Sequence, residues 1–382
     1  MKTLLYILPL IGILLTATEA FPAGIEMPGE ETATIRRGIE YLYNLEYEAA
    51  LTNFASLLPK WQDHPAPWFF TGMVWWIRWS QEDEMKRSGD LLIRNIEVAI
   101  NKSRALLARN PKDAAGIFYL AGGLGFSGRH ALGENNLPRA ITTGWEAFQL
   151  LQKNTNAFQD DVDVLLGHGI FNFYAGRLPA NMRSLAKFLG VQGDWRLGLE
   201  QLQQVASNGV FANTEAEVTL SYIYTYDLRD GSTGARYSKN LMDRYPRNPE
   251  FRFQYAENLI SSGQHDKAKE IAKEGIALAE NNTYTNIPRF RLYCILGKAS
   301  AAERNHEETA RWLTLAVNSP IKTSGNYLAW AHVRRGDAYI ALGNRRAAEA
   351  DYKRGLELDG SGSAGTSAEQ RLQRMAQDAA KK

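Results

Sequence analysis

The chain has 382 residues, of which 45% are hydrophobic and 23% are charged, and its formal net charge is +2. This composition is that of a globular chain that is long enough to bury a large core. The nearly neutral charge gives no electrostatic basis for binding nucleic acid or an anionic membrane surface, and no nucleic-acid-binding motif is present. We therefore expect no nucleic-acid partner.

The first 20 residues have the form of a secretory signal peptide. Lys2 is the positive start, residues 4–15 are apolar, and the segment ends in the small residue Ala20, where cleavage is expected. The apolar run is shorter than the ~20 residues of a membrane-spanning helix. We expect an exported protein, periplasmic in a bacterium or secreted, with no transmembrane segment after cleavage. Retention of the signal as a membrane anchor is the alternative. Residues 21–30 form a leader rich in proline and glycine.

Residues 290–320 contain the clearest helical pattern, two amphipathic helices joined by a turn at residues 303–306. Their apolar and small residues recur with a period near 3.6, so each set lies on one helix face. These residues are Tyr293, Leu296, Gly297 and Ser300, and then Thr309, Leu313 and Ala316. Counted from Phe290, they occupy positions 4, 7, 8, 11, 20, 24 and 27. This spacing resembles the tetratricopeptide (TPR) repeat, a helix–turn–helix unit of about 34 residues.

The same positions recur at both ends of the chain. Positions 8, 11, 20 and 24 hold Gly336, Tyr339, Ala348 and Tyr352 when counting starts at Ala329, and Gly38, Tyr41, Ala50 and Phe54 when it starts at Glu31. One such unit cannot bury its apolar face alone, and therefore several must stack. The sequence predicts an all-α, TPR-like α-solenoid of about eight helix hairpins over residues 31–359, with an irregular, inserted middle. Residues 360–366 are predicted to be a Gly/Ser linker and residues 367–382 a terminal capping helix.

The middle of the chain carries a second resemblance, over residues 168–211. An apolar helix ends at Leu178-Pro179, and a leucine-rich helix, a glycine-bounded turn with Asp194 and another helix follow. This order is similar to that of the eukaryotic tetratricopeptide family of outer-membrane and inclusion-body-clearance proteins. Residues 247–251 fall where that family begins its next repeat. The resemblance implies a protein-interaction role without catalysis.

Signals for catalysis or metal binding are weak. Residues 123–128 fit GxGxxG by letter, but a helical segment precedes them and a dinucleotide site needs a strand there. None of the six histidines has the HExxH spacing or a neighbouring pair of cysteines. We therefore expect no cofactor, no metal site and no enzyme activity. The enzyme alternative requires His168, Asn172 and Arg177 to converge in one pocket.

Cys294 is the only cysteine, which excludes an internal disulfide bond. It is interpreted as a small apolar side chain in a helix. Disulfide pairing with another protein is the alternative.

The resemblance to TPR proteins implies which residues line the concave face, namely positions 2, 5, 9, 12 and 13 of each first helix. In the N-terminal half these positions are mainly apolar and aromatic, and they give the candidate partner-binding groove: Phe69, Met73, Trp76, Tyr119, Phe126, His168, Phe171 and Asn172. In the C-terminal half they are more polar: Phe253, Glu257, Arg291, Cys294, Lys298, Trp330 and Asp337.

These patterns predict an exported, non-catalytic TPR scaffold that binds a protein or peptide partner through an apolar and aromatic concave groove. A carrier of an apolar small molecule or lipid in the same groove is the alternative function. The groove could instead be filled by the chain itself, in which case its aromatic residues belong to the core.

Overall fold

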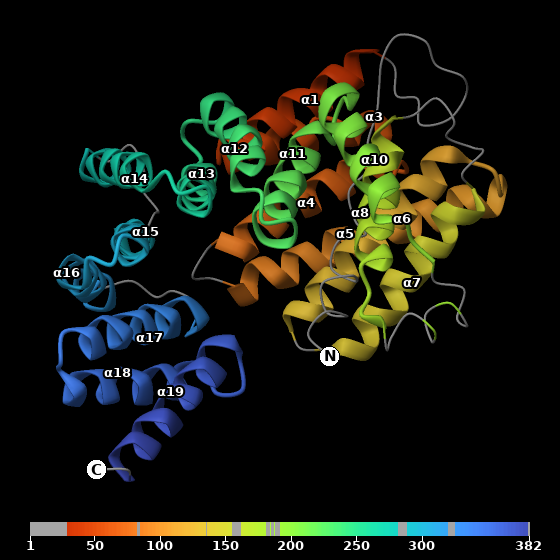
Figure 1. Ribbon diagram of the computed structural model, residues 1–382. Coiled ribbons are helices and arrows are strands. Elements are labelled where there is room, and N and C mark those ends of the chain that lie inside the picture. The colour runs from red at the N-terminus through yellow and green to blue at the C-terminus, as the bar shows by residue number, and fades with distance from the viewer. Residues whose placement is uncertain are drawn as a thin grey trace. The chain divides into compact units, whose positions relative to one another are not determined.

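The computed structural model describes residues 29–81, 85–134, 136–154, 162–180, 184, 187, 192–281, 289–319 and 325–380. Within these ranges the chain forms helices and turns and no strand, as Figure 1 shows, so the predicted all-α class is confirmed. The predicted signal peptide, residues 1–20, lies outside the described residues. Among the described helices, none combines the length and the apolar character that a membrane crossing requires.

The chain divides into two compact units, residues 1–220 and residues 221–382. Unit 1 contains α1 (Gly29–Tyr43), α2 (Tyr47–Ala55), α3 (Leu58–Trp61), α4 (Ala66–Gln81), α5 (Met85–Arg109), α6 (Ala114–Gly133), α7 (Leu137–Lys153), the 3₁₀ turn η3 (Val162–Val164), α8 (Leu165–Gly176) and α10 (Trp195–Asn208). The boundary between the units falls within α11 (Asn213–Tyr222).

Unit 2 continues with the π-helical turn η4 (Ile223–Asp227), α12 (Gly231–Arg244), α13 (Pro249–Ser261), α14 (His265–Glu280), α15 (Arg289–Ala302), α16 (His306–Val317), α17 (Gly325–Ala341), α18 (Arg345–Asp359) and α19 (Ser363–Ala380). Consecutive helices pack as hairpins, for example α4 with α5, α15 with α16, and α17 with α18. The described helices form eight hairpins when α11 and η4 are taken together as the partner of α12, as predicted.

Glycine at position 8 lets the two helices of a hairpin approach each other closely. A Cβ atom on Gly297 would lie 2.6 Å from Cγ of Leu313, and one on Gly336 would lie 2.6 Å from Cε1 of Tyr352. Both partners are buried residues of the second helix. These pairs place the predicted core positions in contact, which confirms the repeat spacing.

The turns of unit 2 are fixed by side-chain caps. Asn305 Oδ1 accepts a hydrogen bond from the amide of Glu308 at 3.1 Å, and Asn344 Oδ1 accepts one from Ala347 at 3.1 Å. Such caps satisfy amide groups that lack partners at a helix start. Gly343 has a φ of 77°, which a glycine adopts without strain and which ends α17 before the turn.

The C-terminal end differs from its prediction. The capping helix α19 begins at Ser363, so that residues 363–366 of the predicted Gly/Ser linker are helical. The reason is the carboxylate of Asp359, which accepts hydrogen bonds from the amides of Ala364 at 2.8 Å and Gly365 at 3.2 Å. The leucine-rich helix expected between Pro179 and Asp194 falls largely on positions outside the described ranges.

Candidate functional site

Five of the eight residues predicted for the aromatic groove lie in the packed interior of unit 1. They are at most 4% exposed: Phe69, Met73, Tyr119, Phe126 and Phe171. The ring centroid of Phe69 lies 5.4 Å from that of Tyr119 and 5.5 Å from that of Phe126. Side chains this buried present no surface to a partner, so the prediction of an open groove is wrong for these five. The alternative, in which they belong to the core, describes the structure.

The remaining three, Trp76, His168 and Asn172, are half-buried. The guanidinium carbon of Arg129 lies 4.3 Å from the ring centroid of Trp76. Nη1 of Arg129 lies 3.5 Å from Oε1 of Glu215, at the start of α11. The start of α11 thus occupies the face on which a partner was expected.

The enzyme alternative requires three residues of α8 and its C-terminal end to converge. Asn172 donates a hydrogen bond to Oε1 of Gln201 at 2.9 Å, on the neighbouring helix α10. The guanidinium of Arg177 lies over the rings of Phe173 and Trp195, at 5.5 Å and 5.8 Å. These two side chains are therefore engaged in packing the α8 hairpin. No cluster of three or more potential metal-binding side chains occurs among the described residues.

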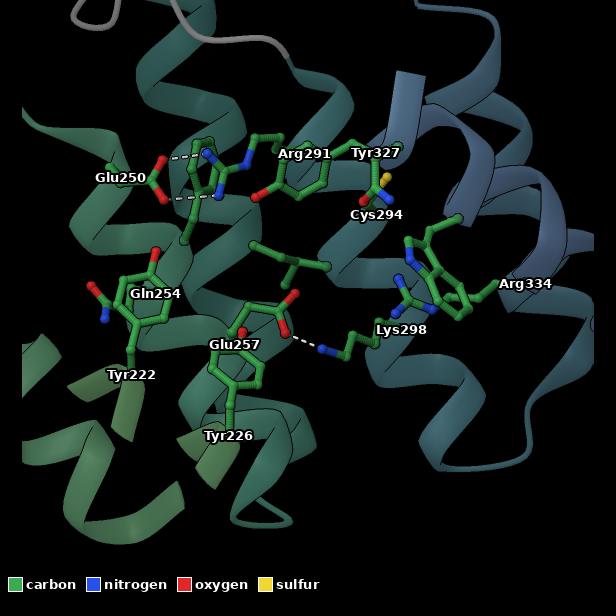
Figure 2. Close-up of a pocket in the computed structure, with 14 residues that line it drawn as sticks. Tyr222, Tyr226, Glu250, Gln254, Glu257, Arg291, Cys294, Lys298, Tyr327 and Arg334 are labelled. Carbon is green, nitrogen blue, oxygen red and sulfur yellow. Dashed lines mark hydrogen bonds and ion pairs between the residues drawn. The ribbon is translucent and has the colours of Figure 1, made fainter. Parts of the chain in front are cut away.

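A pocket of about 190 Å³ lies in unit 2 and is lined by the first helices of four successive hairpins (Figure 2). The end of α11 and η4 contribute two residues, and α13, α15 and α17 contribute the others. The polar half of the predicted concave face lies here. Six of its seven residues line the pocket: Phe253, Glu257, Arg291, Cys294, Lys298 and Trp330.

The seventh, Asp337, has a different role. Its Oδ2 atom lies 2.7 Å from Nη2 of Arg371 on α19, and its Oδ1 atom accepts a hydrogen bond from the hydroxyl of Tyr352 at 2.8 Å. In an internal repeat this position lies on the concave face. In the last repeat α19 packs against α17, so the residue at the same position contacts the capping helix.

Two ion pairs join α13 to α15 across the pocket. Nη2 of Arg291 donates to Oε1 of Glu250 at 3.0 Å, and Nη1 donates to the other carboxylate oxygen, so this pair is bidentate. Lys298 pairs with Glu257 seven residues further along each helix, which is about two turns (Figure 2). Burial alone would lower the pKa of Arg291, but the Glu250 carboxylate and the neighbouring hydroxyls of Tyr327 and Tyr222 together raise it. Arg291 is thus always charged, and the Glu250 carboxylate already serves as its counter-ion.

Aromatic rings surround these charges. The guanidinium of Arg291 lies 4.2 Å from the centroid of Phe253 and 5.0 Å from that of Tyr327. Tyr222 and Tyr226 stack on each other with centroids 5.9 Å apart, and they are 39% and 53% exposed. Tyr327 is 48% exposed. Large rings that remain this accessible inside a pocket are suited to contact a ligand.

Sequence reasoning missed several of these residues. Tyr222 and Tyr226 are presented at a π-helical turn, which inserts residues that a TPR register does not count. Their spacing of four was the only signal, and it equally fits a buried helix face. Glu250 occupies position 2 of the repeat that starts at Pro249. This is one of the concave positions, so the TPR register could have identified Glu250.

Arg334 extends from α17 toward the pocket (Figure 2). Its guanidinium carbon lies 5.1 Å from the ring centroid of Trp330. Among the described residues no carboxylate lies within ion-pair distance of it, so it differs from Arg291 and Lys298. With Arg291, Lys298 and Arg334 against Glu250 and Glu257, the pocket has one positive charge in excess.

Cys294 lies among these side chains. Burial raises the pKa of its thiol to about 12, and the Glu257 carboxylate acts in the same direction, while Arg334 and Arg291 act against it. At neutral pH the thiol is therefore protonated, and a protonated thiol is a poor nucleophile and a poor metal ligand. The side chains of the pocket are therefore suited to binding a ligand and not to nucleophilic catalysis by Cys294.

Several solved structures are similar to the chain. A tetratricopeptide repeat protein from Parabacteroides merdae ATCC 43184 shares 15% identity, with a TM-score of 0.46, over 73% of this chain and 91% of that chain. The TPR domain of P58(IPK) shares 16% identity, with a TM-score of 0.29, over 93% and 100%. Yeast Tom70 shares 10% identity, with a TM-score of 0.30, over 91% and 96%.

Two family models match the sequence. A tetratricopeptide repeat model matches residues 331–361, which include most of α17 and all of α18. The model named Iml2/Tetratricopeptide repeat protein 39 matches residues 125–319, just over half of the chain, and this range includes the α13 and α15 sides of the pocket. The chain therefore belongs to the Iml2/Tetratricopeptide repeat protein 39 family.

Proposed function

We propose that this chain is a non-catalytic scaffold that binds a segment of a partner protein in the pocket of unit 2. One observation supports the site more than any other: four successive first helices direct aromatic and charged side chains into one pocket. The repeats of the family place their first helices side by side, so a ligand can contact several repeats at once.

The composition of the pocket favours a protein segment over an apolar small molecule. Tyrosine, tryptophan and arginine are the side chains most enriched at protein-binding hot spots. Pockets that enclose small molecules usually measure about 300–1,000 Å³ and are mostly apolar. This pocket measures about 190 Å³ and contains five charged side chains. An extended segment that crosses four helices would span roughly 30 Å, or about nine residues.

The test is co-purification of partners from the native host, measured by quantitative mass spectrometry. The variant Tyr226→Ala with Tyr327→Ala removes two exposed rings from the pocket. Its control is Leu315→Ala with Leu342→Ala, which removes exposed side chains outside the pocket, 44% and 43% exposed. We expect the tyrosine variant to keep its helix content and lose the partner, and the control to keep both.

Equal recovery of partners with both variants would exclude this pocket. Native mass spectrometry of the purified chain tests the carrier alternative. A small apolar molecule that co-purifies in stoichiometric amount would favour the carrier over the scaffold.

We also propose that the protein is exported, supported by the signal-like pattern of residues 1–20. Mass spectrometry of the protein from its host measures the N-terminus. A mature chain that begins at Phe21 is expected, and a chain that retains residues 1–20 would instead support a membrane anchor or a protein that is not exported.

A further inference from the structure

We propose that the pocket of unit 2 selects a carboxylate, which Arg334 binds, next to an aromatic or apolar side chain, which the tyrosines contact. This inference rests on the proposed function and specifies the chemistry of the bound segment. The carboxylate can be an Asp or Glu side chain or a C-terminus, because both offer the same two oxygens.

The three cations of the pocket differ in their partners. Glu250 occupies Arg291 in a bidentate pair, and Glu257 occupies Lys298. Arg334 is half-buried and lines the same pocket, and no carboxylate among the described residues is within ion-pair distance of it. A half-buried charge without a counter-ion is unfavourable, so an anionic group that approaches Arg334 gains more than one that approaches a satisfied cation.

The geometry of Arg334 suits a carboxylate. Its guanidinium lies over the indole of Trp330, at 5.1 Å from the ring centroid. Stacking covers one face of the guanidinium and leaves the N–H groups in its plane free to donate to two oxygens. The indole is itself held, because its Nε1 atom donates to Oγ of Ser363 at 3.3 Å, at the start of α19.

The rest of the pocket restricts where the anion can lie. Glu250 and Glu257 place negative charge on α13, which disfavours a carboxylate on that side. Tyr222 and Tyr226 lie on the opposite side of the pocket from Arg334 in Figure 2. The acidic group is therefore expected at α17, and the aromatic or apolar group toward the tyrosines.

The experiment is selection of a displayed random heptapeptide library on the full chain. The variant is Arg334→Gln, which removes the charge and keeps much of the side-chain volume. The control is Arg311→Gln: Arg311 also stacks on an indole, 4.7 Å from the centroid of Trp312, but it lies outside the pocket and is 66% exposed. Circular dichroism checks that each variant is folded.

We expect the wild-type chain and Arg311→Gln to enrich peptides that present a carboxylate, from Asp, Glu or a free C-terminus, near an aromatic or aliphatic residue. Arg334→Gln should lose this enrichment, and the dissociation constant of a selected peptide should rise roughly 10- to 100-fold. Arg334→Lys keeps the positive charge but lacks the planar guanidinium. Its dissociation constant for the selected peptide should therefore lie between those of the wild type and Arg334→Gln. Replacing the acidic residue by its amide, and comparing free with amidated C-termini, identifies which carboxylate is bound.

Selected peptides that contain no acidic residue and bind equally well with an amidated C-terminus, or peptides that bind Arg334→Gln as tightly as the wild type, would overturn the inference and leave the proposed function standing. If the wild-type chain enriches no peptide, both fail. If Arg334→Gln does not fold, the test uses the wild-type chain alone. Its affinity for the selected peptide is then compared with its affinity for the same peptide in which an amide replaces the carboxylate. Equal affinity for the two peptides would then overturn the inference.

Discussion

Asn258→Ala should destabilise unit 2, because the side chain of Asn258 is fully buried on α13 and joins three elements. Its Nδ2 atom donates to Oγ of Ser221 at 2.7 Å and to Oγ of Ser238 at 2.8 Å, and its Oδ1 atom accepts from the hydroxyl of Thr225. Through these bonds α13 holds the end of α11, η4 and α12. A single polar side chain thus fixes the turn that presents two pocket tyrosines.

The size of the effect follows from these contacts. Each hydrogen bond contributes about 1 kcal/mol to stability, so the loss of three costs about 3 kcal/mol. The three hydroxyl groups keep backbone acceptors, for example the carbonyl of Gly234 for Ser221 and Ser238, so none becomes an unpaired buried donor. A loss of about 3 kcal/mol corresponds to a melting temperature lower by roughly 6–12 °C.

The assay is urea-induced unfolding followed by far-UV circular dichroism, with hydrogen exchange of residues 221–261 to assign the change to unit 2. The assignment is needed because two units can unfold separately. Asn281→Ala, at the exposed end of α14, is the control and should change the free energy of unfolding by less than about 0.5 kcal/mol. A loss below about 1 kcal/mol for Asn258→Ala would refute the reasoning.

Three further predictions concern unit 2. Gly336→Val should lower the free energy of unfolding by roughly 2–3 kcal/mol in a urea titration, because a Cβ atom there would lie 2.6 Å from the ring of Tyr352. Alkylation of Cys294 by iodoacetamide should be slow at pH 8 and still rise above pH 10, because the thiol pKa is about 12, and a plateau near pH 9 would contradict this. Burial raises the pKa of Asp351, but hydrogen bonds from Arg335 and His332 lower it more, so its net pKa falls below 3.8. Its contribution to stability is therefore present above the unfolded pKa and is lost as the pH falls through the folded one, so the wild type should lose more stability than Asp351→Asn between about pH 5 and pH 2.

The regular part of the fold could be predicted from the sequence because its determinants are local. Gly336 and Tyr352 are 16 positions apart, within one repeat, and the close approach of their helices follows from the absence of a Cβ atom. The same register placed Arg291 and Lys298 on the predicted concave face, and both line the pocket of unit 2. Wherever repeats follow one another without insertion, counting positions is enough to find the face a residue lies on.

The rest of the fold depends on contacts between residues that are far apart in the sequence, and no periodic pattern predicts these contacts. The hydroxyl of Tyr43 lies 3.4 Å from Oε2 of Glu215, which is 172 positions away. The carboxylate of Asp163 accepts hydrogen bonds from the amides of residues 210–212, which fixes the loop before α11. Such long-range contacts fill the face of unit 1 that its aromatic pattern predicts to be open. The π-helical turn at Tyr226 likewise cannot be predicted from a pattern that assumes 3.6 residues per turn.

Binding at the pocket of unit 2 is tested most directly by site-specific photocrosslinking to a selected heptapeptide. Benzoylphenylalanine replaces Tyr327, which lines the pocket and is 48% exposed, or Leu315, which lies on α16 outside the pocket and is 44% exposed. The peptide should crosslink at position 327 and not at position 315. Equal crosslinking at the two positions, or crosslinking at position 315 alone, would contradict binding in this pocket.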